Sequence, residues 1–220
     1  MSAAEILNDA DGELINFYYI LHKHGRRLAA EVDSMPYSRA LFKKMLVAKP
    51  RGAYRRAVRF WYLNRVAFGA KRRGASFGVA ASCRRYVLPG GVLVDLDATV
   101  ERLRGVVFES VDLCRLIRLY DRASSLFYID PPFYGVSQEY ACRFAADDHQ
   151  RLAVALASVS GRWLLSYNDC SHIRRLYRGS RFKRLRTRYT IGANSRSCQA
   201  SSAADELLIS NRPLRRTRCK

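Results

Sequence analysis

The chain has 220 residues, 49% of them hydrophobic, so it can bury the core of one domain, or of one domain that carries a smaller inserted lobe. Its 39 Lys and Arg residues against 19 Asp and Glu residues give a formal net charge of +20, which favours a polyanionic partner because bound cations release the counterions of phosphates. No apolar run approaches the roughly 18 residues that span a bilayer, and the N-terminus lacks the basic and apolar regions of a signal peptide.

The cysteines and histidines indicate no metal site. The six cysteines are scattered, at positions 83, 114, 142, 170, 198 and 219, and no two have the C-x-x-C spacing of a zinc or redox pair. The four histidines form no cluster with them in the sequence. We therefore expect no bound metal ion and reduced thiols in a cytoplasmic protein.

A membrane surface is the alternative to a nucleic acid as the partner of so large a positive charge.

The first half of the chain is predicted to be mainly helical. A short buried strand in residues 4–11 comes first. The spacing of apolar residues then predicts helices over residues 12–25, 26–35, 38–48, 53–70 and 96–105. The first of these helices is expected to stop at Gly25. Residues 71–91 are rich in Gly, Ser and Arg and indicate a loop with little regular structure.

The second half alternates between strand and helix. Strands are predicted over residues 106–110, 125–130, 162–169, 182–191 and 205–213, and helices over 112–121, 147–161 and 170–179. Such alternation is typical of an α/β sheet with crossover connections, and we expect the first strand of the chain to join it. The prediction is a discontinuous α/β core of residues 1–22 and 105–214, an inserted helical lobe of residues 23–104 and a basic tail of residues 215–220.

The tetrapeptide Asp130-Pro131-Pro132-Phe133 directly follows a predicted strand. In open α/β sheets, ligands bind outside the carboxyl ends of the strands. Prolines have no N–H and hold the chain rigid, so the Asp130 carboxylate and the Pro131 carbonyl form two neighbouring acceptors, which match the two hydrogens of an exocyclic amino group. The Phe133 ring can stack on a base. The alternative is a strand that ends in a Pro-Pro turn capped by Asp130.

The segment SLFYIDPPFYG resembles the catalytic segment of the Dam-type DNA adenine methyltransferases, usually written D-P-P-Y, with Phe133 in the position of the tyrosine. Further segments resemble family segments in the family's order, namely ILNDADGELINFYYIL, AVRFWYLNRVAFGA, VFESVDLCRLI, FAADDHQRLAVAL, WLLSYND and DELLISN. Together they cover nearly all of residues 5–211. One short motif is a weak signal, whereas this many in order are specific.

The resemblance implies a Rossmann-like sheet and methyl transfer from S-adenosylmethionine to the 6-amino group of adenine in double-stranded DNA. Asp130 and the Pro131 carbonyl would hold the amino group, and Phe133 would stack on a flipped adenine. Asp9 or Asp11 would bind the ribose of the cofactor, and Asp112 its adenine. Candidate contacts to the substrate DNA are Tyr134, Asn64, Arg65, Arg72, Arg73, Tyr167 and Asn168.

Several of these residues have a plain structural alternative. Asp9 can be a helix cap or turn residue, and Asp112 can cap the helix over 112–121, with or without a cofactor contact. Residues 166–169 fit a turn as well as a substrate contact, and the aromatic residues before Asn64 fit a core. His149 is expected to be structural. Arg72 and Arg73, like Arg84 and Arg85, are phosphate contacts or a solvated face, and the net charge favours phosphate contacts.

The family's glycine-rich cofactor loop does not occur in this sequence. Members of the family carry a Lys-x-x-Gly-Gly-Lys segment and a Phe-x-Gly-x-Gly-like loop ahead of the segment that Asp9 belongs to. The missing strand would lie in the middle of the sheet, beside the strand that ends at Asp130. We consider a misassigned start, a split or decayed gene of a mobile element, or a separate chain that supplies the segment. These residues alone are expected to bind S-adenosylmethionine weakly and to methylate little.

Two other functions compete with the leading one. The first is a DNA-binding remnant that keeps the basic lobe without catalysis. The second is a methyltransferase acting on amino groups of RNA or protein, since similar motifs occur there, although those enzymes usually carry the cofactor loop first and lack the helical insertion. The recognition sequence, a partner restriction enzyme, and an origin in a bacterium or a phage are not determined by the sequence.

Overall fold

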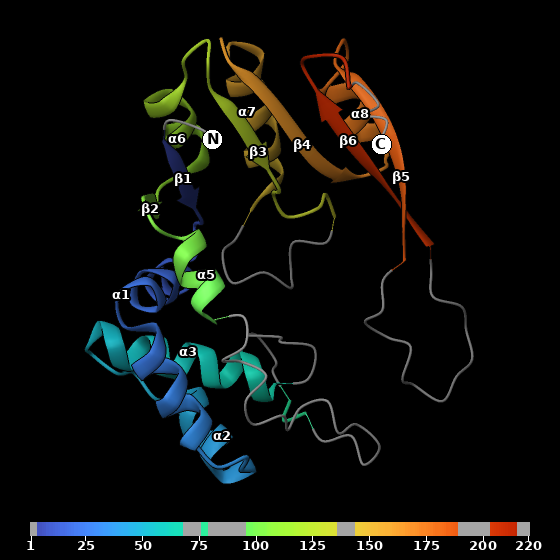
Figure 1. Cartoon of the computed structure of the whole chain (residues 1–220). Helices are drawn as coiled ribbons and strands as arrows, with labels where there is room; N and C mark the ends of the chain where they lie inside the picture. The colour runs from blue at the N-terminus through green and yellow to red at the C-terminus, as the bar shows by residue number, and fades with distance from the viewer. Residues whose placement is uncertain (1–3, 68–75, 79–95, 136–143, 189–202, 215–220) are drawn as a thin grey trace, which may run out of the picture. The chain divides into compact units, whose positions relative to one another are not determined.

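The computed structural model describes residues 4–67, 76–78, 96–135, 144–188 and 203–214 (Figure 1). The chain divides after Val111 into two units, unit 1 from Met1 to Val111 and unit 2 from Asp112 to Lys220, and each is described by itself. Both contain helices and strands, so the fold is of the mixed α/β class that the sequence predicts.

Unit 1 places a helical segment between two paired strands. β1 (Glu5–Asn8) and β2 (Val106–Glu109) are parallel neighbours, with Glu5 opposite Val106 and Asn8 opposite Glu109. The chain between them forms α1 (Gly12–Ser34), α2 (Arg39–Val47), α3 (Ala53–Val66) and α5 (Leu96–Arg102). β1, the first strand of the chain, therefore pairs with β2, the first strand of the half in which strands and helices alternate. The two strands are parallel and are joined by a long connection.

The predicted boundary between two helices at Gly25 lies one residue from a kink in α1. α1 spans Gly12–Ser34, and two helical segments meet at His24, whose φ of −138° and ψ of 29° are not helical. A Cβ at Gly25 would lie 2.9 Å from Cγ2 of Val100 on α5. The glycine therefore directly follows the break between the two segments and also allows α5 to approach it closely.

The core of unit 1 follows from the apolar stripes of its helices. Leu28, Ala29 and Val32 of α1 are buried with Ala57 and Val58 of α3, as helical spacing requires. A smaller cluster lies around Phe42, Tyr62 and Val66. In the loop predicted over 71–91 the structure describes residues 76–78, where Phe77 joins this smaller cluster and makes a single bridge to Ala67.

Unit 2 is built on a four-stranded sheet. Its strands are β3 (Leu126–Ile129), β4 (Arg162–Asn168), β5 (Arg181–Arg188) and β6 (Ala203–Ser210), in the order β3-β4-β6-β5. β3 and β4 are parallel, and β6 is antiparallel to both β4 and β5. The helices are α6 (Leu113–Tyr120), α7 (Ala146–Ala157) and α8 (Ser171–Leu176). Hydrogen bonds between the described strands form this sheet and the β1-β2 pair, and do not join them into the one sheet that we expected.

One face of this sheet carries the core. Phe127 and Ile129 of β3 and Leu165 of β4 are buried together with side chains of α6, α7 and α8. The residues that alternate with them on β3 face the other way, and Leu126 and Tyr128 are 67% and 68% exposed. Because β3 and β4 are parallel, their carboxyl ends meet at one edge of the sheet, where Asp130 and Asn168 lie.

The described helices include none that is long and apolar enough to cross a membrane.

Candidate functional site

The segment from Asp130 to Tyr134 leaves β3 at the carboxyl edge of the unit 2 sheet. Asp130 is exposed, Pro131 is buried, and Phe133 and Tyr134 are half-buried against the core. Gly135 then has a φ of +83°, a left-handed conformation that favours glycine. The buried proline fixes a short loop that presents a carboxylate outward beside a half-buried aromatic ring.

Ser166 of β4 holds the carboxylate of Asp130. Its Oγ donates a hydrogen bond to Oδ1 of Asp130 at 2.5 Å. Oδ2 of Asp130 receives no hydrogen bond from the described residues. Ser166 therefore orients the carboxylate through Oδ1, and an external donor can bind Oδ2.

Asn168, at the end of β4, fixes the chain just after Phe133. Its Oδ1 accepts from the backbone N–H of Tyr134 at 3.0 Å, and its Nδ2 donates to the carbonyl of Tyr134 at 3.1 Å. Both ends of the amide are thus used on one residue of the neighbouring loop. The side chain of Asn168, a predicted substrate contact, thus holds the loop that carries Asp130 and Phe133.

Two histidines contact the ring of Tyr134. The ring stacks on His172 of α8 with centroids 4.1 Å apart, and meets the edge of His149 of α7 at 5.2 Å. His149 is buried, and its Nδ1 lies 2.7 Å from the hydroxyl of Tyr167. Burial lowers the pKa of His149, the charge of His172 lowers it further, and Asp148 opposes the shift. The neutral form of His149 is therefore favoured.

Tyr167, another predicted substrate contact, lies within the core. Its side chain is fully buried, and burial raises its pKa above the ordinary value of a tyrosine. The hydroxyl is paired with His149 and the ring packs beside Tyr177. Its position suits support of the loop through His149 better than contact with a base.

The carboxylates predicted to bind a cofactor in unit 1 follow β1. Oδ1 of Asp9 accepts from the N–H of Asp11 at 2.7 Å, and Asp11 is the N-cap of α1, with its Oδ1 accepting from the N–H of Glu13 at 3.0 Å. Asn8 links β1 to the chain after β2, because its amide donates to the carbonyl of Val111 at 3.2 Å and accepts from the N–H of Val111 at 3.0 Å.

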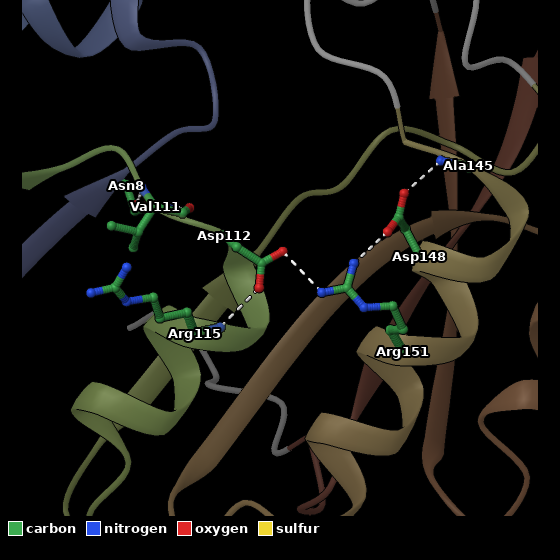
Figure 2. Close-up of polar contacts among 7 residues, drawn as sticks. All are labelled: Asn8, Val111, Asp112, Arg115, Ala145, Asp148 and Arg151. Carbon is green, nitrogen blue, oxygen red and sulfur yellow. Dashed lines mark hydrogen bonds and ion pairs between the residues drawn. The ribbon is translucent and has the colours of Figure 1, made fainter.

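Asp112, the residue after Val111, is the N-cap of α6 (Figure 2). This is the structural role predicted as an alternative to a cofactor contact. Its Oδ1 accepts from the N–H of Arg115 at 3.0 Å, and its Oδ2 lies 3.3 Å from Nη2 of Arg151 on α7. Arg151 also pairs with Asp148 at 2.6 Å, whose Oδ2 accepts from the N–H of Ala145 at 2.8 Å. The carboxylate thus has a fixed orientation at the N-terminus of a helix.

These carboxylates suit a nucleoside ligand in their chemistry. Asp9 and Asp11 follow one strand of a parallel pair and Asp112 follows the other, and carboxylate oxygens accept hydrogen bonds from ribose hydroxyls and from an adenine amino group. Among the described residues no group of three or more His, Cys, Asp or Glu side chains could hold a metal ion.

The predicted DNA contacts of unit 1 have structural partners or lie outside the described residues. Asn64 donates from Nδ2 to the carbonyl of Phe60 at 2.9 Å. Arg65 forms an ion pair with Asp33, and their side chains are only 21% and 17% exposed. The basic residues of the predicted loop, Arg72, Arg73, Arg84 and Arg85, lie outside the part of the chain that the structure describes.

Sequence reasoning missed several residues of this site. The contacts of Asn8, Arg151 and His172 join positions far apart in the chain and have no local signal. Ser166 was included in residues 166–169, which the sequence interpretation gave as a turn or a substrate contact, but its hydrogen bond to Asp130 across the paired strands β3 and β4 was not predicted.

Comparison with known proteins gives a consistent family. The family model of the D12 class N6 adenine-specific DNA methyltransferases matches residues 3–191. The type II methyltransferase M.CviBI of Paramecium bursaria Chlorella virus NC1A is 22% identical over 178 residues, which are 80% of this chain and 68% of that protein.

Proposed function

The chain belongs to the D12 class N6 adenine-specific DNA methyltransferases, and from this premise we propose that it transfers a methyl group from S-adenosylmethionine to the 6-amino group of adenine at specific sites in double-stranded DNA. The resemblance found in the sequence is thereby confirmed at the level of the family. The observation that carries the proposal is the exposed Asp130 at the carboxyl end of β3, with one oxygen held by Ser166.

The proposed role of Asp130 is to accept a hydrogen bond from the adenine amino group through Oδ2. The carbonyl of Pro131 accepts the second amino hydrogen. Two acceptors in fixed positions orient the nitrogen lone pair away from the loop, toward the methyl donor. Orientation of the reacting groups is the main catalytic contribution in such a site, and the contacts of Ser166 and Asn168 support it by limiting the motion of the loop.

The adenine must leave the duplex to reach this loop, because its amino group takes part in base pairing. Phe133 is half-buried against the core, so its ring can offer a fixed surface to the flipped base. Stacking of a base on an aromatic side chain contributes about 1–3 kcal/mol. The ring of Tyr134, the next residue, contacts His172 and His149, and these contacts limit the motion of the chain that follows Phe133.

The cofactor would be held by Asp9 or Asp11 and by Asp112. Asp9 and Asp11 are proposed to accept hydrogen bonds from the ribose hydroxyls, and Asp112 from the adenine amino group. The bound cofactor supplies an electrophilic methyl group on a sulfonium sulfur. We further propose that the chain has the Rossmann-like fold of S-adenosylmethionine-dependent methyltransferases.

The test uses a labelled methyl group of S-adenosylmethionine and duplex DNA, with incorporation and DNA binding measured in parallel. Asp130→Ala should abolish incorporation and leave the dissociation constant for DNA nearly unchanged, because it removes the acceptor and no phosphate contact. Asp147→Asn, an exposed carboxylate on α7, is the matched control and should retain activity. Binding of DNA by the wild-type chain without Asp130-dependent incorporation would support a DNA-binding remnant instead.

A further inference from the structure

The stretch of unit 2 after Asp169 is strongly basic. No acidic residue occurs between Asp169 and Asp205 in the sequence. The cations of its described part lie in and after α8 and along β5, at positions 174, 175, 178, 181, 183, 184, 186 and 188. Much of the positive charge of unit 2 is therefore gathered at one end of the sheet, where β5 is the outermost described strand (Figure 1).

The cations of β5 differ in how the protein neutralises them. Nε of Arg184 lies 3.3 Å from Oδ2 of Asp169, a largely buried carboxylate that Arg174 also binds at 2.7 Å. Arg181, Lys183 and Arg186 are exposed, and none of the described carboxylates forms an ion pair with them. These three cations can bind an external anion without breaking an internal contact.

The register of the sheet places β5 in line with Asp130. Ile129 pairs with Leu165, so Asp130 lies beside Ser166, Ser166 pairs with Leu208, and Leu208 pairs with Lys183. Three strand-to-strand steps of about 4.8 Å put the Lys183 backbone roughly 14 Å from that of Asp130. β5 also runs in the same direction as β4, since both are antiparallel to β6.

Lys183 and Asp130 lie on the same face of the sheet. The neighbours Leu207 and Ile209 are buried on the helix-covered face, so Leu208 and its partner Lys183 point to the other face. Ser166 lies on that face between the buried Leu165 and Tyr167, and it bonds Asp130. Arg181 shares this face with Lys183, whereas Arg186 alternates to the helix-covered face together with Arg184.

From this placement we propose that Arg181 and Lys183 of β5 bind phosphates of the DNA strand that flanks the target adenine. The inference rests on the proposed function and adds a second contact surface to it, in unit 2. Residues two apart on a strand are about 6.6 Å apart. Each DNA strand carries one charge per about 3.4 Å of helix axis, and consecutive phosphates lie further apart in space than this rise because they also wind around the axis. Arg181 and Lys183 therefore match neighbouring phosphates.

Charged side chains on an outer strand have another common role, because they prevent the strand from pairing with a second molecule. That role needs charge but no bound phosphate. The two roles differ in one measurable quantity, the dependence of DNA affinity on salt. Each phosphate contact contributes about 0.9 to the slope of log K against log salt concentration, whereas protection of an edge contributes nothing.

The experiment measures duplex binding by the full chain from 50 to 300 mM salt. The double variant Arg181→Gln, Lys183→Gln should lower the slope by about 2 and weaken binding about 10-fold at moderate salt. The control removes the same charge at the opposite edge of the sheet, by Arg118→Gln and Arg122→Gln, both exposed residues. It should change the slope by less than about 1.

Methyl transfer separates this inference from the proposed function. In the double variant, KM for DNA should rise while kcat at saturating DNA and the affinity for S-adenosylmethionine stay close to wild type. A slope equal in the double variant and the control, with wild-type methylation intact, would overturn the β5 contact and leave the proposed function standing. A wild-type chain that binds DNA through β5 without methylating adenine would overturn the proposed function and support the contact.

Discussion

The side-chain amide of Asn168 closes two hydrogen bonds on the backbone of Tyr134, at 3.0 and 3.1 Å. The two residues are separated by 34 positions: Asn168 is the last residue of β4, and Tyr134 lies in the loop that follows the neighbouring parallel strand β3. Tyr134 directly follows Phe133, so this contact fixes the far end of the loop whose near end is the last residue of β3. The loop is held at both ends before any ligand binds.

Asn168→Ala should lower kcat/KM for methyl transfer about 10- to 100-fold, because a loop that moves by an ångström loses much of the benefit of orientation. Asn168→Asp keeps the acceptor for the N–H of Tyr134 and loses the donor to its carbonyl, so it should lie between wild type and the alanine variant. Steady-state kinetics on duplex DNA measures both. Equal kcat/KM for all three proteins would show that the contact has no part in catalysis.

Ser166→Ala should reduce kcat more than it changes KM. The substitution removes the donor that orients Oδ1 of Asp130 and leaves the carboxylate itself in place. Ser158→Ala is the control, since Ser158 is an exposed residue whose hydroxyl bonds only the carbonyl of Ala155 among the described groups. An unchanged kcat in Ser166→Ala would mean that Asp130 needs no orienting donor.

Asp112→Asn separates capping from cofactor binding. Asparagine caps helices about as well as aspartate, so the free energy of unfolding should change by less than about 1 kcal/mol. The affinity for S-adenosylmethionine should fall, because an amide is a poorer acceptor for an amino group. Arg151→Gln removes the same ion pair and keeps the carboxylate, so calorimetric titration should find near wild-type affinity. Equal losses in both variants would point to the ion pair.

The stability of the protein should fall as the pH drops below about 6.5, partly through His149. Burial lowers the pKa of His149 in the folded state. As the pH falls, the unfolded chain therefore binds a proton at a higher pH than the folded chain does. The stability that comes from the neutral ring is complete above the unfolded pKa and is lost as the pH falls toward the folded pKa. Urea unfolding from pH 8 to pH 5 should show a smaller slope in His149→Gln. His22→Gln, at an exposed position, should keep the wild-type slope.

Gly161→Ala should destabilise unit 2 by about 1–3 kcal/mol. Its Cβ would lie 2.7 Å from the carbonyl oxygen of Ser125 and 2.8 Å from that of Arg122, and backbone atoms cannot move aside easily. Gly12→Ala is the control, because the added Cβ meets Ser110 Oγ at an ordinary 3.6 Å in the first turn of a helix. Thermal unfolding measures both. A melting temperature of Gly161→Ala equal to wild type would contradict the clash.

The sequence by itself determined the order of strands and helices and the position of the acidic Pro-Pro segment at a strand end. These features depend on apolar periodicity and on Pro and Gly, which act within a few residues. The same local signals placed a helix boundary at Gly25, next to the kink at His24, but they did not predict the approach of Val100, 75 positions later.

Only the tertiary structure decided which side chains meet. Ser166 orients Asp130, Asn168 holds Tyr134, and Asp112 meets Arg151, and each contact depends on the register or packing of elements that are distant in the chain. The alignment of Lys183 with Asp130 likewise requires the strand order β3-β4-β6-β5. Strand order and register follow from the burial of one sheet face as a whole, so no local pattern in the sequence encodes them.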